Sequence, residues 1–349
     1  MIFIINIFKG RSVLFFAKTK GLKKPSVWLL SLLSVIIFLA GCGQSTTNKE
    51  GGSGTAPAPT NQPDKTASST SYTVQHAMGE TKITGKPSRI VVLTNEGTEV
   101  LLSLGIKPVG AVKSWSGTPF YDHIKKDLEG VEVVGDENQP NLEAIAKLKP
   151  DLIIGNKLRQ EKVYAQLSAI APTVFSEKIN ADWQKNFKLY AEALNKKAEG
   201  DQLLGKLDQR IAEFKTKAGD KLNMKVSLVR FIPGKTRLYF NDTFAGFMLK
   251  KIGFQRPQAQ NKETFADEIN KERIPDMEGD ILFYYTWDND KQEASQVEKE
   301  WTNDPLWKNL NVVKKGNVYK VSDDIWNSSG SIISANLMMD DLEKMVLKK

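Results

Sequence analysis

Short apolar runs alternate with longer stretches of helical periodicity over most of the chain after residue 71. Strands that alternate with helices predict a parallel α/β unit. In the first half, three apolar runs are each followed by a stretch in which apolar residues recur at helical spacing. These strand and helix pairs are 90–93 with 98–104, 131–134 with 142–148, and 152–154 with 163–169.

A second set of the same kind follows a long helical region. Apolar residues recur near helical spacing from Asp182 to about Lys217, which predicts one helical segment, or two with a break near Gly200. Further strands are predicted at 225–231, 280–285 and 318–321, with a closing helix from Ser331. The pattern predicts an α/β protein with two α/β lobes joined by one long helix and a ligand cleft between them. We expect the N-terminal lobe at 72–181, the interlobe helix at 182–219 and the C-terminal lobe at 220–349.

The first 41 residues are typical of a secretory signal peptide. A basic cluster at 18–24 precedes the apolar run 27–40, which is too short to span a bilayer comfortably. The following Leu39-Ala40-Gly41-Cys42 resembles a bacterial lipobox. The resemblance implies cleavage before Cys42, lipidation of its sulfur and attachment to the extracytoplasmic face of the cell membrane. The alternative is an uncleaved anchor with an incidental cysteine. After the lipidated Cys42, residues 43–71 consist mainly of Gly, Ser, Thr, Pro and Ala, so 42–71 is expected to be a flexible tether.

The net charge and the scarcity of metal-ligating residues argue against several classes of function. The net charge is +8, but the first 41 residues hold six basic side chains and no acid, which leaves +2 for the rest and little support for nucleic-acid binding. Direct capture of Zn²⁺ or Mn²⁺ normally needs several histidines with carboxylates, whereas His76 and His123 are far apart and Cys42 is the single cysteine. A bound metal is therefore expected to arrive already chelated. The sequence contains no G-x-S-x-G, H-E-x-x-H or P-loop motif, so an exported lipid-anchored enzyme is the less favoured alternative.

Five segments spread over the predicted folded part share one family's motifs in the family's order. They are KPSRIVVLTNEGTEVLLSLGIKPVGAV (86–112), PNLEAIAKLKPDLIIG (140–155), QLSAIAPTV (166–174), NKERIPDMEGDILF (270–283) and WNSSGSIISANLMMDDL (326–342). In these segments the chain resembles the FhuD-like solute-binding proteins that serve ABC importers of iron chelates, haem and cobalamin.

The resemblance implies a function and a set of partners. It implies two lobes on a rigid connecting helix with little motion between them, and a monomer that captures a ferric siderophore without acting on it chemically. The expected partners are a pair of permease subunits and a separate ATPase, and no cofactor is expected besides the preformed Fe³⁺–siderophore ligand. Haem or cobalamin is the alternative ligand within the family, with Tyr121, His123 and Tyr285 as candidate axial ligands.

The sequence offers side chains suited to a ferric siderophore, which is a bulky, partly apolar chelate with an oxygen-rich face. Guanidinium groups bind such oxygens and aromatic rings pack against the chelator. Family members that bind hydroxamate or related siderophores use Arg, Tyr and Trp, and several such residues here fall near predicted strand ends, where open α/β sheets bind ligands. The candidate ligand-binding residues are Arg159, Arg230, Arg237, Trp115, Tyr285, Trp287 and Trp326.

The type of siderophore and the docking residues are also suggested by this resemblance. Three arginines favour a hydroxamate or citrate-hydroxamate over a strongly anionic catecholate. Some hydroxamate-binding relatives have an arginine before the Pro-Asn-Leu-Glu motif, whereas this chain has Asp136-Glu137-Asn138-Gln139, which leaves the ligand open. In relatives, one glutamate of each lobe pairs with permease arginines, and Glu99 and Glu272 are the positions that we match to them.

Overall fold

A computed structural model describes residues 70–180 and 183–347 of the chain. The predicted signal peptide, Cys42 and most of the predicted tether lie outside the described residues. Within these two ranges, no helix is both long enough and apolar enough to cross a membrane.

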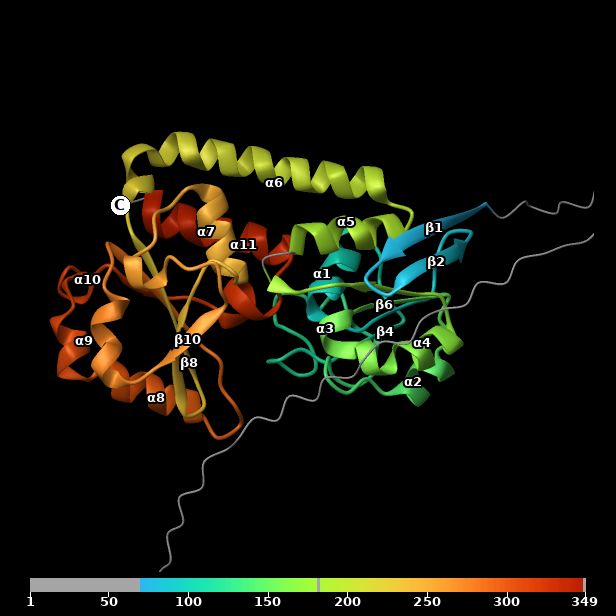
Figure 1. Cartoon of the computed structure of the whole chain (residues 1–349), viewed down its shortest axis with the longest axis horizontal. Helices are drawn as coiled ribbons and strands as arrows, with labels where there is room; N and C mark the ends of the chain where they lie inside the picture. The colour runs from blue at the N-terminus through green and yellow to red at the C-terminus, as the bar shows by residue number, and fades with distance from the viewer. Residues whose placement is uncertain (1–69, 181–182, 348–349) are drawn as a thin grey trace, which may run out of the picture. The chain divides into compact units, whose positions relative to one another are not determined.

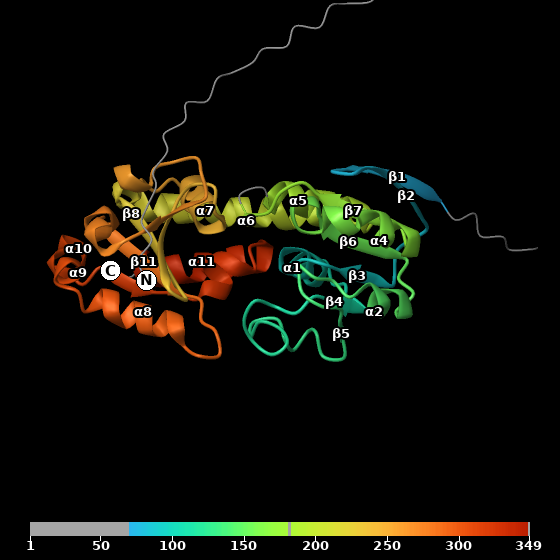
Figure 2. The ribbon, with the colours of Figure 1, turned by 60° about the horizontal axis from the view of Figure 1, so that its bottom comes forward.

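The first lobe is built on a parallel sheet with the strand order β5-β4-β3-β6-β7. Every residue of β3 and β6 is buried, as expected for parallel strands that helices cover on both faces. A hairpin of β1 and β2 lies beside β7 and α5 (Figure 2). The elements are β1 Ser71–His76, β2 Gly79–Thr84, β3 Ile90–Val92, α1 Asn95–Ser103, β4 Gly110–Ala111, β5 Glu132–Val133, α2 Leu142–Lys147, β6 Leu152–Asn156, α3 Lys157–Gln160, η1 Glu161–Val163, α4 Tyr164–Ile170 and β7 Thr173–Ser176.

Two helices, not one, follow the first lobe. α5 (Trp183–Ala193) packs on α1 and β7 of the first lobe, and α6 (Lys197–Ala218) connects to the second (Figure 1). The break lies at Asn195, whose φ is +54°, and not near Gly200. Gly200 lies within α6, where an added Cβ would come within 2.7 Å of the Cβ of Ala191, so the glycine lets α5 and α6 pack closely. The connection is therefore α6 alone, which spans about 33 Å at 1.5 Å per residue.

The second lobe contains a mixed sheet with the order β10-β9-β8-β11-β12. β8, β11 and β12 are parallel, whereas β9 is antiparallel to both β8 and β10. The sequence pattern predicted the three parallel strands and missed β9 and β10. The elements are η3 Gly219–Asn223, β8 Val226–Ile232, β9 Lys235–Tyr239, α7 Phe244–Ile252, η4 Gln258–Gln260, β10 Ala266–Ile269, η5 Lys271–Met277, β11 Ile281–Thr286, α8 Glu293–Thr302, α9 Pro305–Asn309, α10 Asn311–Lys314, β12 Val318–Lys320, η6 Asp324–Ser328, α11 Ile332–Leu342 and η7 Glu343–Leu347.

One hydrophobic core continues from the first lobe into the second. It includes Val100 of α1, Tyr190 of α5, Phe214 of α6 and Met338 of α11, and α1 packs directly against α11. Because side chains in a close-packed core resist displacement, a shared core favours a small range of motion between the lobes. The predicted fold class, two α/β lobes joined by one long helix, is confirmed.

Candidate ligand-binding site

A cavity of about 280 Å³ lies between the two lobes. On the first-lobe side, each segment that lines it follows the C-terminal end of one strand of the parallel sheet, where α/β sheets commonly bind ligands. On the second-lobe side, strands β8 and β9, two loops, and the end of η6 with the residues after it form the wall. The lining residues are Thr94, Glu96, Trp115, Glu137, Arg159, Ile179 and Asn180 from the first lobe, and Arg230, Ile232, Arg237, Phe265, Trp287, Asn327, Ser328, Ser329 and Gly330 from the second.

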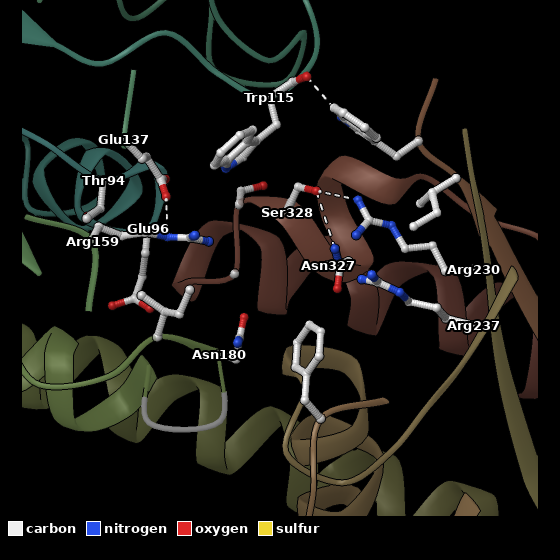
Figure 3. Close-up of a pocket in the computed structure, with 16 residues that line it drawn as sticks. Thr94, Glu96, Trp115, Glu137, Arg159, Asn180, Arg230, Arg237, Asn327 and Ser328 are labelled. Atoms are coloured by element: carbon white, nitrogen blue, oxygen red, sulfur yellow. Dashed lines mark hydrogen bonds and ion pairs between the residues drawn. The ribbon is translucent and has the colours of Figure 1, made fainter. Parts of the chain in front are cut away.

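All three predicted arginines line this cavity. In Figure 3, Arg159 lies on the opposite side of the cavity from Arg230 and Arg237. Arg159 is in α3, directly after β6, and Arg230 is in β8, as the strand pattern predicted. Arg237 lies within β9, not in the expected turn, and its partner in the sheet register is Arg230.

Arg230 is held in place by a nearly buried carboxylate. Its Nε and Nη2 donate to the two oxygens of Asp323 at 2.6 and 2.9 Å, and its Nη1 donates to the hydroxyl of Tyr239 at 3.0 Å. The side chains of Arg230 and Asp323 are 12% and 4% exposed. Burial by itself lowers the pKa of Arg230, but the Asp323 carboxylate and Tyr239 outweigh it, so the pKa ends above its ordinary value. Arg230 therefore stays charged and keeps a fixed orientation at the cavity wall.

Arg159 is held more loosely. Its Nε lies 3.6 Å from Oε2 of Glu137, and its guanidinium carbon lies 5.7 Å from the centre of the Trp115 ring. Glu137 is only 5% exposed and accepts hydrogen bonds from the backbone and side-chain amides of Asn95 at 2.7 and 2.8 Å. Burial raises the pKa of Glu137, while the hydrogen bonds from Asn95 and the charge of Arg159 oppose this shift. Since α1 begins at Asn95, Glu137 also satisfies an N–H group of the first turn of that helix.

Two tryptophans close one side of the cavity. The indole N–H of Trp287, directly after β11, donates to the backbone carbonyl of Trp115 at 2.9 Å and so joins the two lobes (Figure 3). The guanidinium carbon of Arg230 lies 5.9 Å from the centre of the Trp287 ring. Arg237 is less engaged, with a side chain 31% exposed and 3.9 Å from the Glu268 carboxylate. Of the three arginines that line the cavity, Arg237 lies farthest from its acidic partner.

Two of the predicted aromatic residues do not line the cavity. Tyr285 follows the strand pattern and pairs in register with Arg230, but it is fully buried, with its ring 5.7 Å from that of Tyr239. Trp326 is also fully buried, packs against Phe283 at 4.6 Å between ring centres, and donates its indole N–H to Asp341 at 2.8 Å. Both are core residues, so their assignment as ligand contacts is corrected.

The predicted docking residues have opposite environments. Glu272, in the first turn of η5, is exposed. Glu99 is fully buried in α1, and its oxygens accept hydrogen bonds from the backbone N–H and the hydroxyl of Ser334. A carboxylate in this setting cannot reach another protein, so the assignment of Glu99 as a docking residue is wrong.

The sequence analysis did not assign several of the lining residues to the site. Asn327, Ser328 and Gly330 belong to a polar, glycine-containing segment after the predicted strand 318–321, and this position after a strand was a usable signal. Glu137 was noted only as a departure from the family pattern. Phe265 gave no signal, because the strand β10 that it precedes was not predicted.

The comparisons with known proteins agree with this geometry. A model of the family described as periplasmic binding proteins matches residues 90–325. The chain belongs to this family. Its members bind substrates and are not enzymes, so this periplasmic binding protein is a binding protein as well. Among the described residues, no group of three or more His, Cys, Asp or Glu side chains is placed to hold a metal ion.

Individual relatives share most of their length with this periplasmic binding protein. The "Probable siderophore-binding lipoprotein YfiY" of Bacillus subtilis is 46% identical over 94% of this chain and 99% of its own. The "Achromobactin-binding periplasmic protein" of Dickeya dadantii is 32% identical over 74% and 86%. Among solved structures, Staphylococcus aureus SirA complexed with staphyloferrin B is 40% identical, covers 78% of this chain and 98% of its own, and superposes with a TM-score of 0.74.

Proposed function

We propose that this protein is a lipid-anchored solute-binding protein on the extracytoplasmic face of the membrane, which captures a ferric siderophore and delivers it to an ABC importer. The observation that carries the proposal is the convergence of Arg159, Arg230 and Arg237 with Trp115 and Trp287 on one cavity between the lobes. Guanidinium groups suit the oxygens of a chelate and indole rings suit its apolar parts. The names of the relatives support a siderophore as the ligand.

The charges around the cavity favour a chelate of low net charge. Three arginines face the cavity, but Glu96 and Glu137 also line it, and Asp323 binds Arg230 directly. A strongly anionic ferric catecholate would meet these carboxylates without enough free positive charge to offset them. A ferric hydroxamate or citrate-hydroxamate fits this balance better, with its oxygens toward Arg237 and Arg159.

Haem is a weaker candidate in this cavity. An axial ligand from Tyr121, His123 or Tyr285 would have to reach the iron, but none of the three lines the cavity. Tyr121 and Tyr285 are fully buried, and the Nε2 of His123 is 2.7 Å from Glu99.

Ligand binding is tested by tryptophan fluorescence titration against ferric hydroxamates, a ferric citrate-hydroxamate, ferric citrate, ferric staphyloferrin B, a ferric catecholate, haem and cobalamin. We expect saturable quenching by a ferric siderophore of low charge, because Trp115 and Trp287 line the cavity. Arg237→Ala should weaken binding about tenfold through the loss of a charge-assisted hydrogen bond, with little change in stability.

Lys235→Ala is the matched control, because Lys235 lies on the same strand and pairs with the same Glu268 but does not line the cavity. Binding of haem or cobalamin alone would retain the family and refute the proposed ligand. No quenching by any compound in the series would refute the proposed function.

The two lobes repeat one local motif, which points to a docking pair. Residues 141–154 (NLEAIAKLKPDLII) and 270–283 (NKERIPDMEGDILF) each place a glutamate at the second position of a short helix before a central strand. The repeat extends to the aspartates that precede β6 and β11. Asp151 accepts from the backbone N–H of Arg89 at 2.9 Å, and Asp280 from that of Lys225 at 2.7 Å, in each case just before the neighbouring strand.

Glu143 and Glu272 are therefore equivalent, exposed acids on the two lobes. We place the contacts with the permease subunits at these two residues, with Glu143 replacing Glu99.

Replacing both glutamates with alanine should greatly reduce uptake of the ferric ligand by cells and leave the affinity of this protein for the ligand unchanged. Each single replacement should reduce uptake about tenfold, because each removes one charge that guides and holds the docked partner. Uptake of radioactive iron by cells that carry the importer measures the effect, and fluorescence titration measures binding. Glu192→Ala, an exposed acid of α5, is the control. Normal uptake by the double variant would exclude this docking pair.

A further inference from the structure

The helix α11 of the second lobe begins without a cap of its own. Ser331 occupies the N-cap position but makes no capping hydrogen bond, and its buried hydroxyl has no hydrogen-bond partner within residues 70–180 and 183–347. The first N–H groups of a helix have no partner within the helix, and leaving them unpaired in a buried place is costly. Ser331 and Ser334 are both fully buried, so the N–H group of Ser334 needs a partner within the protein.

The missing cap is supplied by the other lobe. Glu99 of α1 accepts from the backbone N–H of Ser334 at 3.0 Å and from its hydroxyl at 2.6 Å. A carboxylate at a helix N-terminus is also favoured by the helix dipole. The Oε1 atom that accepts from the Ser334 hydroxyl also lies 2.7 Å from Nε2 of His123, which belongs to the first lobe. Glu99 and its partner Ser334 are 235 positions apart in the sequence.

The capped end of α11 is continuous with the cavity wall. The hydroxyl oxygens of Ser334 and Ser329 lie 3.0 Å apart, and Ser329 lines the cavity. The neighbouring Ser328 donates to Asp323 at 2.5 Å and contacts Arg230 at 3.4 Å. The chain of contacts therefore runs from Glu99 through α11 to the segment that surrounds Arg230.

We propose that Glu99 is a positioning residue that ties the second-lobe wall of the cavity, residues 327–330, to the first lobe and keeps it in the binding geometry. The carboxylate acts through Ser334 and does not touch the ligand. This role rests on the proposed function only where ligand affinity is concerned, since the tie between the lobes exists without a ligand.

Hydrogen–deuterium exchange of the full-length protein in detergent tests the tie directly. Without ligand, Glu99→Gln should speed exchange in peptides that cover residues 327–336 about tenfold, because the charged acceptor for the helix end is lost. Exchange in β8 and β11 should not change. Glu192→Gln is the matched control, since Glu192 is an exposed acid on another first-lobe helix. Exchange that is unchanged at 327–336, or equally faster throughout the chain, would overturn the proposal.

Affinity provides the second measurement, with ferric staphyloferrin B as the probe. Glu99→Gln should weaken its binding about tenfold, and the double variant with Ser334→Ala should be no weaker than Glu99→Gln alone, because both act through one contact. Additive losses would overturn the proposal. If Glu99→Gln does not fold, Ser334→Ala, which removes only the hydroxyl that donates to Glu99, must show a smaller increase in exchange at 327–336. If the wild-type protein does not bind ferric staphyloferrin B, that compound is excluded as a ligand, while the exchange experiment still decides the role of Glu99.

Discussion

Arg230→Ala is expected to remove detectable binding of the ferric ligand and to lower the free energy of unfolding by about 3 kcal/mol. Both effects follow from the position of the guanidinium, which faces the cavity and also neutralises Asp323. Without Arg230, the Asp323 carboxylate, with a side chain only 4% exposed, keeps Ser328 as its main remaining partner. Chemical denaturation measures the loss of stability, and fluorescence titration measures the loss of binding.

A double variant separates the two roles of Arg230. Arg230→Met combined with Asp323→Leu removes the buried charges together, and such replacements often restore stability. We expect near-normal stability and no ligand binding from this variant. Arg237→Ala is the single-site comparison, since that side chain is 31% exposed and should change stability by less than about 0.5 kcal/mol. Ligand binding by the stable double variant would show that Arg230 is structural only.

Trp326→Ala is expected to lower the free energy of unfolding by about 4 kcal/mol. The indole is fully buried against Phe283, so its removal leaves a large cavity, and it also takes away the donor to Asp341. Thermal or chemical denaturation measures the loss.

Trp326→Phe distinguishes packing from ligand contact. Phenylalanine retains most of the packing but loses the indole donor and part of the buried ring volume, so we expect a loss of about 1–2 kcal/mol and unchanged ligand affinity. A large loss of affinity in a well-folded Trp326→Phe protein would restore Trp326 to the ligand contacts. The next residues, Asn327 and Ser328, line the cavity, which is why the alanine variant alone would not be decisive.

The arginines were predictable because their positions depend on local pattern. Arg159 and Arg230 are linked to strands with strong apolar signals, and the C-terminal ends of parallel strands meet at one edge of a sheet. For Tyr285 the same reasoning gave a wrong prediction, although its strand was predicted. Its neighbour in the sheet is Arg230. The Tyr285 ring lies in the core beside Tyr239, whereas the longer side chain of Arg230 reaches the cavity. Sequence does not reveal which side chain in a layer is covered by another.

The burial of Glu99, a helix residue, was likewise not predictable from the sequence. Its place in α1 was predicted, and an acid near a helix start is usually exposed. Only the packing of α1 against α11 buries it, through a contact with Ser334 far along the chain. Glu143 and Glu272 are exposed because each lies at the start of a short helix at the surface of its own lobe.

The sequence by itself determined the two α/β lobes, the helical connection and the kinds of side chain available for the ligand, because periodicity and residue chemistry are local properties. Tertiary structure decided which of those side chains meet. The pairing of Arg230 with Asp323, the burial of Tyr285 and Trp326, and the capping of α11 by Glu99 all join residues from different elements. Such contacts depend on how helices and sheets pack against one another, and packing is set by the whole chain and not by any one segment.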